Sequence, residues 1–576
     1  MIREMLRRYR RRYIAGVLLL LVTNGCGLAI PLLLRDAVEA LRGRREAPSV
    51  ATCALLIVAL ASMQALVRAG SRLAVLGASR RIAYDLRNRF FAHLQRLPAT
   101  FFGQVTPGDL MSRAVNDMMS VRSFFGPGIM NLANTFIVYV ASLSVMTWIS
   151  PRLTLAALLP MPLLVLSVQR VSRHLHTRSR ASQERLAALS DHAQENLTAI
   201  QMVKTYAQEE SECAQFARLS ADLRSANLAL ARVRGTLIPL MGSLGGAGSL
   251  VAVWVGGQMV ARGLISLGEF VAFSAYLGFL VWPTVAMGWV INTYQRGRVA
   301  MRRLEEILSH PAEDEGARPD AGITAVEGSI ELRHLTVAHA GGGAPALHDV
   351  SLKIDAGETV ALVGPVGSGK TTIASILTRF LPVPDGTVFI DGKDINRIPL
   401  DVLRPAIGYA PQEAFLFSRT LGENIAFGLD TPRADAVEAA ARMAGLSRDL
   451  EAFPDGLDTR VGEGGLTLSG GQRQRAALAR ALILRPRILI LDDSLSSVDA
   501  ETEQTVLSGV FSAARAATSI LISHRLAAVQ RADRIFVLDA GRLVETGTHE
   551  SLLARDGLYA RMFRRQTRSR LLQEEA

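Results

Sequence analysis

The sequence predicts two fold classes in one chain: an all-α transmembrane domain of six helices with long cytoplasmic helical extensions, followed by an α/β P-loop domain. Three observations support this. The chain has 576 residues, which is too long for a single hydrophobic core. Long apolar runs occur only in the first half. In the second half, short apolar runs alternate with helical patterns, and a glycine-rich stretch follows one of them.

Six segments of the first half are apolar over about 20 residues, the length that crosses a bilayer. Several contain Pro or Gly, which transmembrane helices tolerate where neighbouring helices satisfy the backbone. We predict transmembrane helices near Ile14–Leu34, Thr52–Gly70, Phe125–Ile149, Leu153–Val171, Thr236–Val260 and Phe270–Ile291. The rotation of each helix about its axis is not defined by sequence, so the residues that face the interior of the helix bundle are not predicted. We expect no charge deep within a span.

The connections between these segments differ in length. Segments three and four are joined by a tight hairpin at Ser150–Arg152. Residues 72–97 and 176–210 are long, charged and helical in periodicity, so we expect membrane helices to continue into the cytoplasm there. The transmembrane domain then covers residues 1–308, an acidic Pro- and Gly-rich linker covers 309–328, and the second domain covers 329–576.

The net charge of +12 is compatible with a nucleic-acid partner or with a membrane protein that has basic flanks. The arginines of the first 13 residues come directly before the first apolar segment, which favours the membrane protein and a cytoplasmic N-terminus. Six spans would place the second domain on the same side and argue against a soluble nucleic-acid enzyme. The loop after the first span is also basic, so the orientation depends on the N-terminus. The three cysteines fit neither a disulfide nor a zinc spacing.

A shorter connection follows the second span. Thr106 is a candidate helix cap with Pro107 at the first helical position. Asp109, Arg113 and Asn116 then recur at helical spacing, and we expect them on one exposed face. This segment is either a surface connector or a short crosswise helix that docks on the second domain.

The strongest motif of the chain is the P-loop pattern at Gly364–Thr371, between an apolar strand and a helical segment. Its glycines allow backbone amides to surround phosphates at a helix N-terminus. Lys370 is expected to reach the β- and γ-phosphates, and the Thr371 hydroxyl to bind Mg²⁺. The apolar run Ile488–Leu491 ends in Asp492, which is expected to complete the Mg²⁺ site.

The stretch LSGGQ at Leu468–Gln472 lies between the P-loop and Asp492. Ser469 is a candidate helix cap, and the helix N-terminus that it begins is a candidate anion site. In this position the stretch resembles the signature of ATP-binding-cassette (ABC) ATPases. Over nearly the whole chain, the sequence is similar to an exporter-type ABC half-transporter, as in the multidrug-resistance-like halves of heterodimeric bacterial exporters.

The resemblance implies roles for further residues. Gln412 matches the Q-loop glutamine, Asp499 the D-loop aspartate, and His524 the switch histidine. Thr106–Met118 and the region around Ala193–Thr205 match coupling helices, the second of which engages a partner's ATP-binding domain. The implied catalytic residues are Asp493, His524 and Gln412, and the implied metal ligands are Thr371, Gln412 and Asp492. The implied nucleotide contacts are His339, Gly364, Gly367, Ser368, Gly369, Lys370, Thr371, Thr372, Ser469, Gly470, Gly471 and Gln472.

Two residues depart from the family pattern. His339 stands where an aromatic residue, commonly tyrosine, stacks on adenine, unless the local alignment is shifted and another side chain stacks. Asp493 stands where a glutamate is usually the general base. One methylene fewer withdraws the carboxylate by roughly 1.5 Å, a misplacement that can cost about a hundredfold in rate. We expect this chain's own site to bind ATP and to hydrolyse it slowly.

The sequence therefore predicts one half of a dimeric exporter in the cytoplasmic membrane, driven by ATP and Mg²⁺ and acting on amphipathic small molecules or lipids. The expected partner is a second half-transporter, with a heterodimer favoured over a homodimer, and no nucleic acid. The alternatives are an ATP-binding regulatory half with little turnover and a homodimeric lipid or peptide exporter.

Overall fold

The computed structural model describes residues 2–43, 48–313, 319–338, 345–465, 467–496, 503, 506–510, 517–525 and 529–574. The chain divides into two compact units. The first unit comprises residues 1–95 and 107–310, and the second comprises residues 96–106 and 311–576. The short segment 96–106 therefore belongs to the second unit, although both of its neighbouring segments lie in the first.

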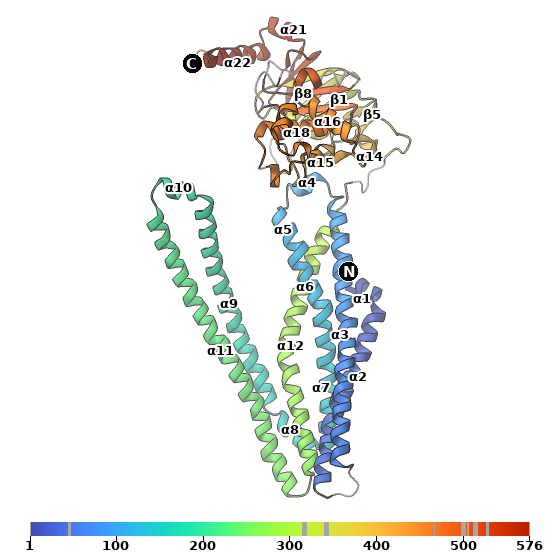
Figure 1. Cartoon of the computed structure of the whole chain (residues 1–576), viewed down its shortest axis with the longest axis vertical. Coiled ribbons are helices and arrows are strands. Elements are labelled where there is room, and N and C mark those ends of the chain that lie inside the picture. Colours follow the sequence, from blue (N-terminus) through green and yellow to red (C-terminus); the bar gives the residue numbers. More distant parts are fainter. Residues whose placement is uncertain are drawn as a thin grey trace. The chain divides into compact units, whose positions relative to one another are not determined.

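The first unit is built of helices, several of them very long (Figure 1). These are α1 (Ile2–Arg8), α2 (Arg10–Leu41), α3 (Val50–Leu94), α5 (Pro107–Ser112), α6 (Met118–Ser123), α7 (Ile129–Ile149), α8 (Pro151–Leu158), α9 (Met161–Thr198), α10 (Ile200–Thr205), α11 (Glu209–Ala261) and α12 (Leu267–Leu308). The π-helical turns η1 (Arg113–Asp117) and η2 (Phe124–Gly128) make α5 to α7 one continuous helical run.

Local sequence signals explain where several helices begin. The Ser49 hydroxyl accepts the Thr52 amide at the start of α3, and Ser150 caps α8 with Pro151 at its first position. Ser266 and Glu269 form a capping box at the start of α12. The fourth apolar segment is divided between α8 and α9, because the chain leaves the helix at Leu159 and Pro160.

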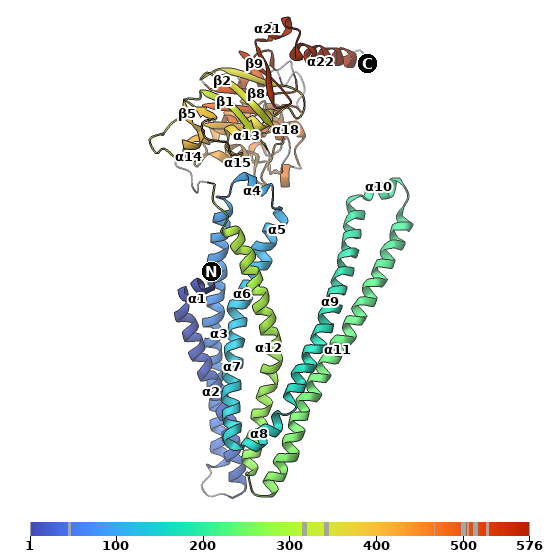
Figure 2. The same cartoon turned by 180° about the vertical axis from the view of Figure 1, so that it is seen from behind.

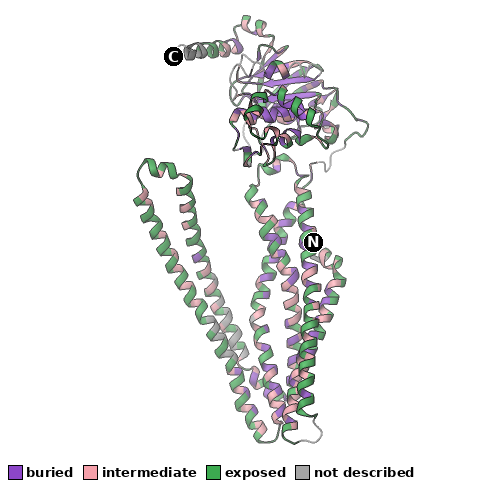
Figure 3. Cartoon of the chain, viewed as in Figure 1, coloured by how far each residue is buried: buried purple, intermediate pink, exposed green. Residues whose placement is uncertain are grey.

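Helices cover the predicted transmembrane segments, the fourth of them as two helices with a break at Leu159 and Pro160. Within the described residues, four helical runs are long and apolar enough to cross a membrane: α2, α3, Pro107–Ile149 and α12. Gly246–Ala261 of α11 is a shorter apolar segment. The count of six spans stays a prediction. α9 and α11 lie side by side in both views (Figures 1 and 2), and exposed residues dominate both helices (Figure 3). The Ser182 hydroxyl joins them through a hydrogen bond of 2.6 Å to Asn227.

The expectation for Thr106–Met118 is wrong in one respect. Pro107 does begin a helix, but residues 107–118 start the long run to α7 instead of a short crosswise helix. Arg113 does not share an exposed face with Asn116. It donates to Asp109 at 2.8 Å and to the carbonyl oxygen of Arg303 in α12. The face of this helix is decided by α12, about 190 residues later, which local spacing does not reveal. The short helix of this connection is α4 (Ala99–Phe102), in the second unit.

The second unit contains two sheets. The antiparallel sheet has the order β2-β1-β4-β5, with β1 (Ile330–Val337), β2 (Leu347–Ile354), β4 (Val388–Ile390) and β5 (Lys393–Asp394). The larger sheet has the order β10-β9-β3-β8-β7-β6, with β3 (Thr359–Val363), β6 (Ile407–Ala410), β7 (Ile488–Asp492), β8 (Thr518–Ile522), β9 (Arg534–Asp539) and β10 (Arg542–Gly547). Strands β9, β3, β8, β7 and β6 run parallel, with Leu362 opposite Ile522 and Leu491 opposite Leu521.

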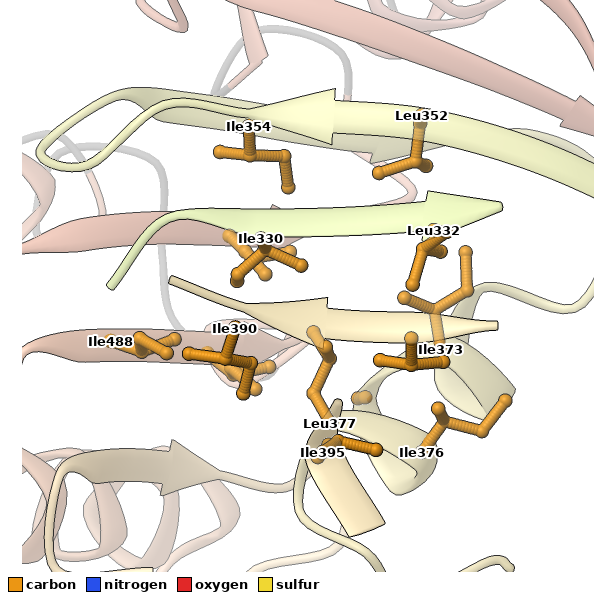
Figure 4. Close-up of a cluster of buried hydrophobic side chains, with 14 of the residues drawn as sticks. Ile330, Leu332, Leu352, Ile354, Ile373, Ile376, Leu377, Ile390, Ile395 and Ile488 are labelled. Carbon is orange, nitrogen blue, oxygen red and sulfur yellow. The ribbon is translucent and has the colours of Figure 1, made fainter. Parts of the chain in front are cut away.

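The helices of this unit include α13 (Lys370–Leu377), α14 (Leu400–Leu403), α15 (Leu421–Ile425), α16 (Ala434–Met443), α17 (Ser447–Ala452), α18 (Gly470–Leu482), α21 (His549–Ala554) and α22 (Leu558–Glu574). Figure 4 shows Ile373, Ile376 and Leu377 of α13 in a core with Ile330 and Leu332 of the antiparallel sheet. Burial between the sheets fixes α13 and therefore the loop that precedes it. A second core packs α15 to α18 against β6 and β7.

The predicted linker is tied to the second unit at Glu313 and at residues 327–328. Glu313 accepts two hydrogen bonds from the Arg404 guanidinium, at 2.6 and 3.0 Å, and its amide donates to the carbonyl oxygen of Arg96. The Asp391 carboxylate accepts the amides of residues 327–329 at 2.7 to 3.0 Å. The end of this linker is therefore a fixed part of the second unit.

Candidate nucleotide site

The predicted site residues gather at one edge of the larger sheet. Parallel strands have their carboxyl ends at the same edge, where α/β proteins bind ligands. The P-loop follows β3, Asp492 ends β7, His524 comes two residues after β8, and Gln412 two residues after β6. These residues are far apart in sequence and reach this edge because β3, β8, β7 and β6 are consecutive neighbours in the sheet.

Three glycines of the P-loop, Gly364, Gly367 and Gly369, have positive φ, and at two of them a Cβ would also meet neighbouring backbone. Gly364 has φ of 154°, and a Cβ there would overlap the carbonyl oxygen of Leu538 in β9. Gly369 has φ of 97°, and a Cβ there would lie 2.7 Å from the carbonyl oxygen of Ala346. The glycines of this motif therefore allow the close approach of β9 and of the segment before β2.

Lys370 begins α13 and is buried. Its ammonium donates to the carbonyl oxygens of Gly364 and Pro365, at 3.0 and 2.8 Å, and to the buried Ser368 hydroxyl at 3.2 Å. Burial lowers the pKa of Lys370, and the carboxylates of Asp492 and Asp493 oppose this shift. A buried cation at a helix N-terminus is the electrostatic environment that a polyphosphate requires.

Thr371 and Asp492 place a hydroxyl and a carboxylate together. The Thr371 hydroxyl donates to Oδ1 of Asp492 at 3.1 Å, across 121 residues of sequence. Asp492 is almost fully buried, and burial raises the pKa of its carboxyl, an effect that the hydrogen bond from Thr371 opposes and the charge of Asp493 reinforces. Two carboxylates then face the single cation of Lys370. This oxygen set and its negative charge fit Mg²⁺, which is typically bound by one or two carboxylates together with substrate phosphates.

Asp493 comes directly after β7 and has φ of 46°, in the left-handed region. Its amide donates to the carbonyl oxygen of Ile522 at 2.8 Å, which fixes the backbone between β7 and β8. Its carboxylate Oδ1 lies 3.5 Å from the amide nitrogen of His524. The structure therefore brings the expected base and the expected switch histidine together.

Gln412 is exposed, and no hydrogen bond of its side chain occurs within the described part of the chain. Segment 415–427, which follows Gln412, is held by Arg480 of α18. This guanidinium donates to the carbonyl oxygens of Asn424 and Phe415 at 2.8 and 2.9 Å. It also lies over the rings of Phe417 and Phe427, at 5.9 and 5.7 Å from their centroids. Arg480 thus joins the Gln412 loop to the helix that carries the LSGGQ stretch.

The LSGGQ stretch forms the N-terminus of α18, as predicted from Ser469. Ser469 and Gln472 make a capping box, in which the Ser469 hydroxyl accepts the Gln472 amide at 3.2 Å. The Gln472 side chain also donates to Asp449 of α17 at 3.0 Å. Among the described residues, no hydrogen bond joins Ser469 or Gln472 to the P-loop. Gly470 and Gly471 are the first two residues of the helix, so their amides point out of its N-terminus.

Two of the predicted residues have no outcome in the structure. His339 and Asp499 lie outside the residues that the structure describes. Thr372 is buried beside the P-loop lysine, as a P-loop residue should be.

Sequence reasoning missed Tyr409 of β6, whose hydroxyl lies 3.5 Å from Oδ2 of Asp492. Burial raises the pKa of Tyr409, so it stays a neutral donor to this carboxylate. Its position in an apolar strand gave no signal, because only the strand order places it beside β7.

Comparisons with known proteins agree with this architecture. Residues 13–284 match the ABC transporter transmembrane region family, and residues 347–496 match the ABC transporter family. The chain is 35% identical over 569 residues to a probable multidrug resistance ABC transporter ATP-binding/permease protein, YheI, of Bacillus subtilis (strain 168), with 97% of this chain and 96% of that protein covered. It is 33% identical over 563 residues to the multidrug resistance-like ATP-binding protein MdlA of Escherichia coli (strain K12), covering 97% and 95%.

A solved structure of a bacterial Atm1-family ABC exporter with ATP bound superimposes with a TM-score of 0.80 at 29% identity, covering 97% of this chain and 99% of that chain. Exporters with one membrane region and one ATP-binding domain in each chain act as dimers. The chain therefore belongs to the ABC transporter family, as a multi-pass membrane protein in which an ATPase domain coupled to transport is fused to an exporter-type transmembrane region.

Proposed function

We propose that this chain is one half of a heterodimeric exporter that moves amphipathic small molecules or lipids across the cytoplasmic membrane by alternating access. In this proposal the N-terminus and the ATP-binding domain are cytoplasmic. The basic first 13 residues support that orientation. One observation carries the proposal. The P-loop is complete and Thr371 lies beside the carboxylate of Asp492, but the next residue, in the position of the general base, is Asp493.

In this proposal, each residue of the nucleotide site has a separate role. The amides from Gly364 to Thr372 and the Lys370 ammonium bind the phosphates of ATP. Mg²⁺ would be held by Thr371, Asp492 and Gln412, and it would neutralise charge on the phosphates. The γ-phosphate of the ATP at the partner's P-loop is bound by the signature stretch of this chain, Ser469, Gly470, Gly471 and Gln472. His339 stacks on adenine, and His524 contacts the γ-phosphate.

Asp493 makes this site slow. A general base must reach the water from which it takes a proton, within about 3 Å. The Asp493 backbone is fixed by its hydrogen bond to Ile522, so the strand does not move forward to compensate for the missing methylene. The partner half would carry a glutamate at this position, and this chain's own LSGGQ stretch would complete the partner's faster site.

Steady-state ATPase measurements test this proposal. The chain is purified alone and together with a candidate partner half-transporter that carries the glutamate, each time as the natural protein and as Asp493→Glu. We expect slow hydrolysis by the chain alone and an increase of up to about a hundredfold with the glutamate. Lys370→Ala is the control that removes ATP binding. Brisk hydrolysis by the chain alone, unchanged by Asp493→Glu, would show that the site is not slow and would favour a homodimeric exporter.

A further inference from the structure

The first unit contains a cavity that the nucleotide site does not involve. Its volume is about 390 Å³, within the range of small-molecule sites. Four helices line it: α2, α3, α7 and α12. These helices lie side by side in both views (Figures 1 and 2). All of its lining residues belong to the first unit.

The α3 side of the cavity is polar and basic. Gln64, Arg68, Ser71 and Arg72 line it at spacings of four, three and one, which place them on one face of the helix. Within the described residues, Arg68 and Arg72 make neither a hydrogen bond nor an ion pair, and no Asp or Glu lines the cavity. Two cations therefore face this space without a protein anion to neutralise them.

The neighbouring helices add amides. Asn24 of α2 donates to Asn134 of α7 at 3.1 Å, and both residues line the cavity together with Asn131. Within the described residues, the side chains of Gln64 and Asn131 make no hydrogen bond. The polar groups of α2, α3 and α7 thus supply hydrogen-bond donors around the two guanidinium groups.

Contacts between α2 and α3 place this polar cluster within the predicted membrane span. The Ser71 hydroxyl donates to the carbonyl oxygen of Gly16 at 2.8 Å, and Gln64 packs where a Cβ on Gly27 would otherwise lie. Arg68 lies between Gln64 and Ser71 on the same helix face. It is therefore opposite Gly16–Gly27, inside the span Ile14–Leu34. Arg68 is also two residues from the end of its own predicted span, Thr52–Gly70. Ionisable residues within a span are costly and mark ligand pathways.

The opposite side of the cavity is apolar and aromatic. Phe279, Trp282 and Pro283 of α12 line it, with Met130 and Val138 of α7. A ligand that satisfies both sides has an anionic head group and an apolar body. A cationic or uncharged amphiphile would leave the guanidinium groups without a counter-charge.

We propose that this cavity is a binding site for amphipathic anions, with Arg68 and Arg72 holding a carboxylate, sulfonate or phosphate head group and α12 contacting the apolar body. This inference rests on the proposed export function and names its substrate class. The same chemistry is found in anionic membrane lipids and in soluble anionic amphiphiles.

The test is a binding measurement in the absence of ATP, so that it does not depend on hydrolysis. The full-length transporter is placed in phosphatidylcholine nanodiscs. The probe is 11-(dansylamino)undecanoic acid, and its uncharged methyl ester is the matched control. Trp282 lines the cavity, so energy transfer from tryptophan to the dansyl group reports occupancy, with Trp282→Phe and empty nanodiscs as signal controls.

We expect the acid to bind at least about tenfold more tightly than the ester, and Arg68→Gln/Arg72→Gln to remove this difference. Arg68→Lys/Arg72→Lys keeps both charges and should retain binding within about threefold. Arg152→Gln changes an exposed arginine of α8 outside the cavity and should have no effect. Equal binding of acid and ester, or unchanged binding in the double glutamine variant, would overturn the proposal.

Phosphatidylglycerol nanodiscs identify the source of the ligand. Displacement of the probe there assigns the site to anionic lipid, and retention assigns it to soluble anions. The Lys370→Ala variant separates this inference from the export function. If Lys370→Ala binds the acid normally while the natural dimer shows no ATP-driven transport, the export proposal fails and the anion site stands. If transport proceeds and the arginine pair has no effect on binding, only the anion site fails.

Discussion

The Thr371 hydroxyl donates a hydrogen bond of 3.1 Å to the buried carboxylate of Asp492, from the first turn of α13 to the end of β7. This contact joins the P-loop helix to the strand that carries the second carboxylate. It prepares two oxygen ligands before any cation arrives, at the cost of burying a charge.

The raised pKa of Asp492 predicts a pH dependence. Its folded-state pKa lies above the ordinary value of 3.8, so the folded chain binds this proton more tightly than the unfolded chain. Stability from this group is therefore present at low pH and is lost as the pH rises through the raised pKa. Without Mg²⁺, Asp492→Asn should raise the unfolding temperature at pH 7, by roughly 2–4 °C for each kcal/mol relieved.

Calorimetry of the whole chain at pH 5 and pH 7, with and without Mg²⁺ and ATP, measures this effect. The variant should also lose the stabilisation that Mg²⁺ adds to ATP binding. A lower unfolding temperature for Asp492→Asn without ligands at pH 7 would contradict the prediction.

Two substitutions of Ser469 can distinguish its effect on the stability of α18 from its effect on nucleotide binding. Ser469→Ala should destabilise α18 by about 1 kcal/mol, because the Gln472 amide loses its acceptor. Ser469→Asp keeps a good helix cap but places a negative charge where the partner's γ-phosphate would bind. It should retain stability and abolish ATP-dependent dimer closure. Hydrogen exchange of α18 and ATPase assays of the dimer measure the two effects, and an active Ser469→Asp dimer would exclude the phosphate contact.

Gly364 and Gly367 of the P-loop can be compared directly by substitution with alanine. A Cβ on Gly364 would overlap the carbonyl oxygen of Leu538, whereas a Cβ on Gly367, with φ of 80°, has no neighbour within 4 Å. Gly367→Ala should therefore cost only the backbone strain of about 1–2 kcal/mol. Gly364→Ala must also displace β9 and should be clearly more destabilising. Chemical denaturation, monitored through the hydrogen exchange of β3 and β9, distinguishes the two variants. An equal loss of unfolding free energy in both variants would refute the steric argument.

Arg480 is expected to connect the Gln412 loop to the signature helix. Arg480→Ala leaves the carbonyl oxygens of Asn424 and Phe415 without their donor and should destabilise the domain by about 2–3 kcal/mol. Arg480→Lys should recover little, because an ammonium lacks the planar fork and stacks poorly on aromatic rings. The matched control is Arg442→Ala on the exposed side of α16, with an expected effect within about 0.5 kcal/mol. Full recovery of stability in Arg480→Lys would show that only the positive charge of Arg480 matters, and would contradict this prediction.

Local sequence patterns predicted those parts of the site that local geometry decides. The P-loop glycines, the strand that ends in Asp492 and the cap at Ser469 depend on neighbours within a few residues. Tyr409 and Arg480 were not predicted because strand order and helix packing bring them to partners 83 and 56 residues away. Arg113 was misplaced for the same reason, since α12 decides which way it points. The cavity at Arg68 required the register of α2 against α3, which hydropathy does not contain.

The contacts of Glu313 also show where along the chain the second unit begins after α12. α12 ends at Leu308, and Glu313, five residues later, is already bound to Arg404 and Arg96. Five extended residues reach at most about 18 Å. The connection from α12 to the second unit is therefore five residues long and does not extend over the whole acidic linker. The chain also passes between the units at residues 95–96 and 106–107, so any motion between the units is shared among three crossings of the chain.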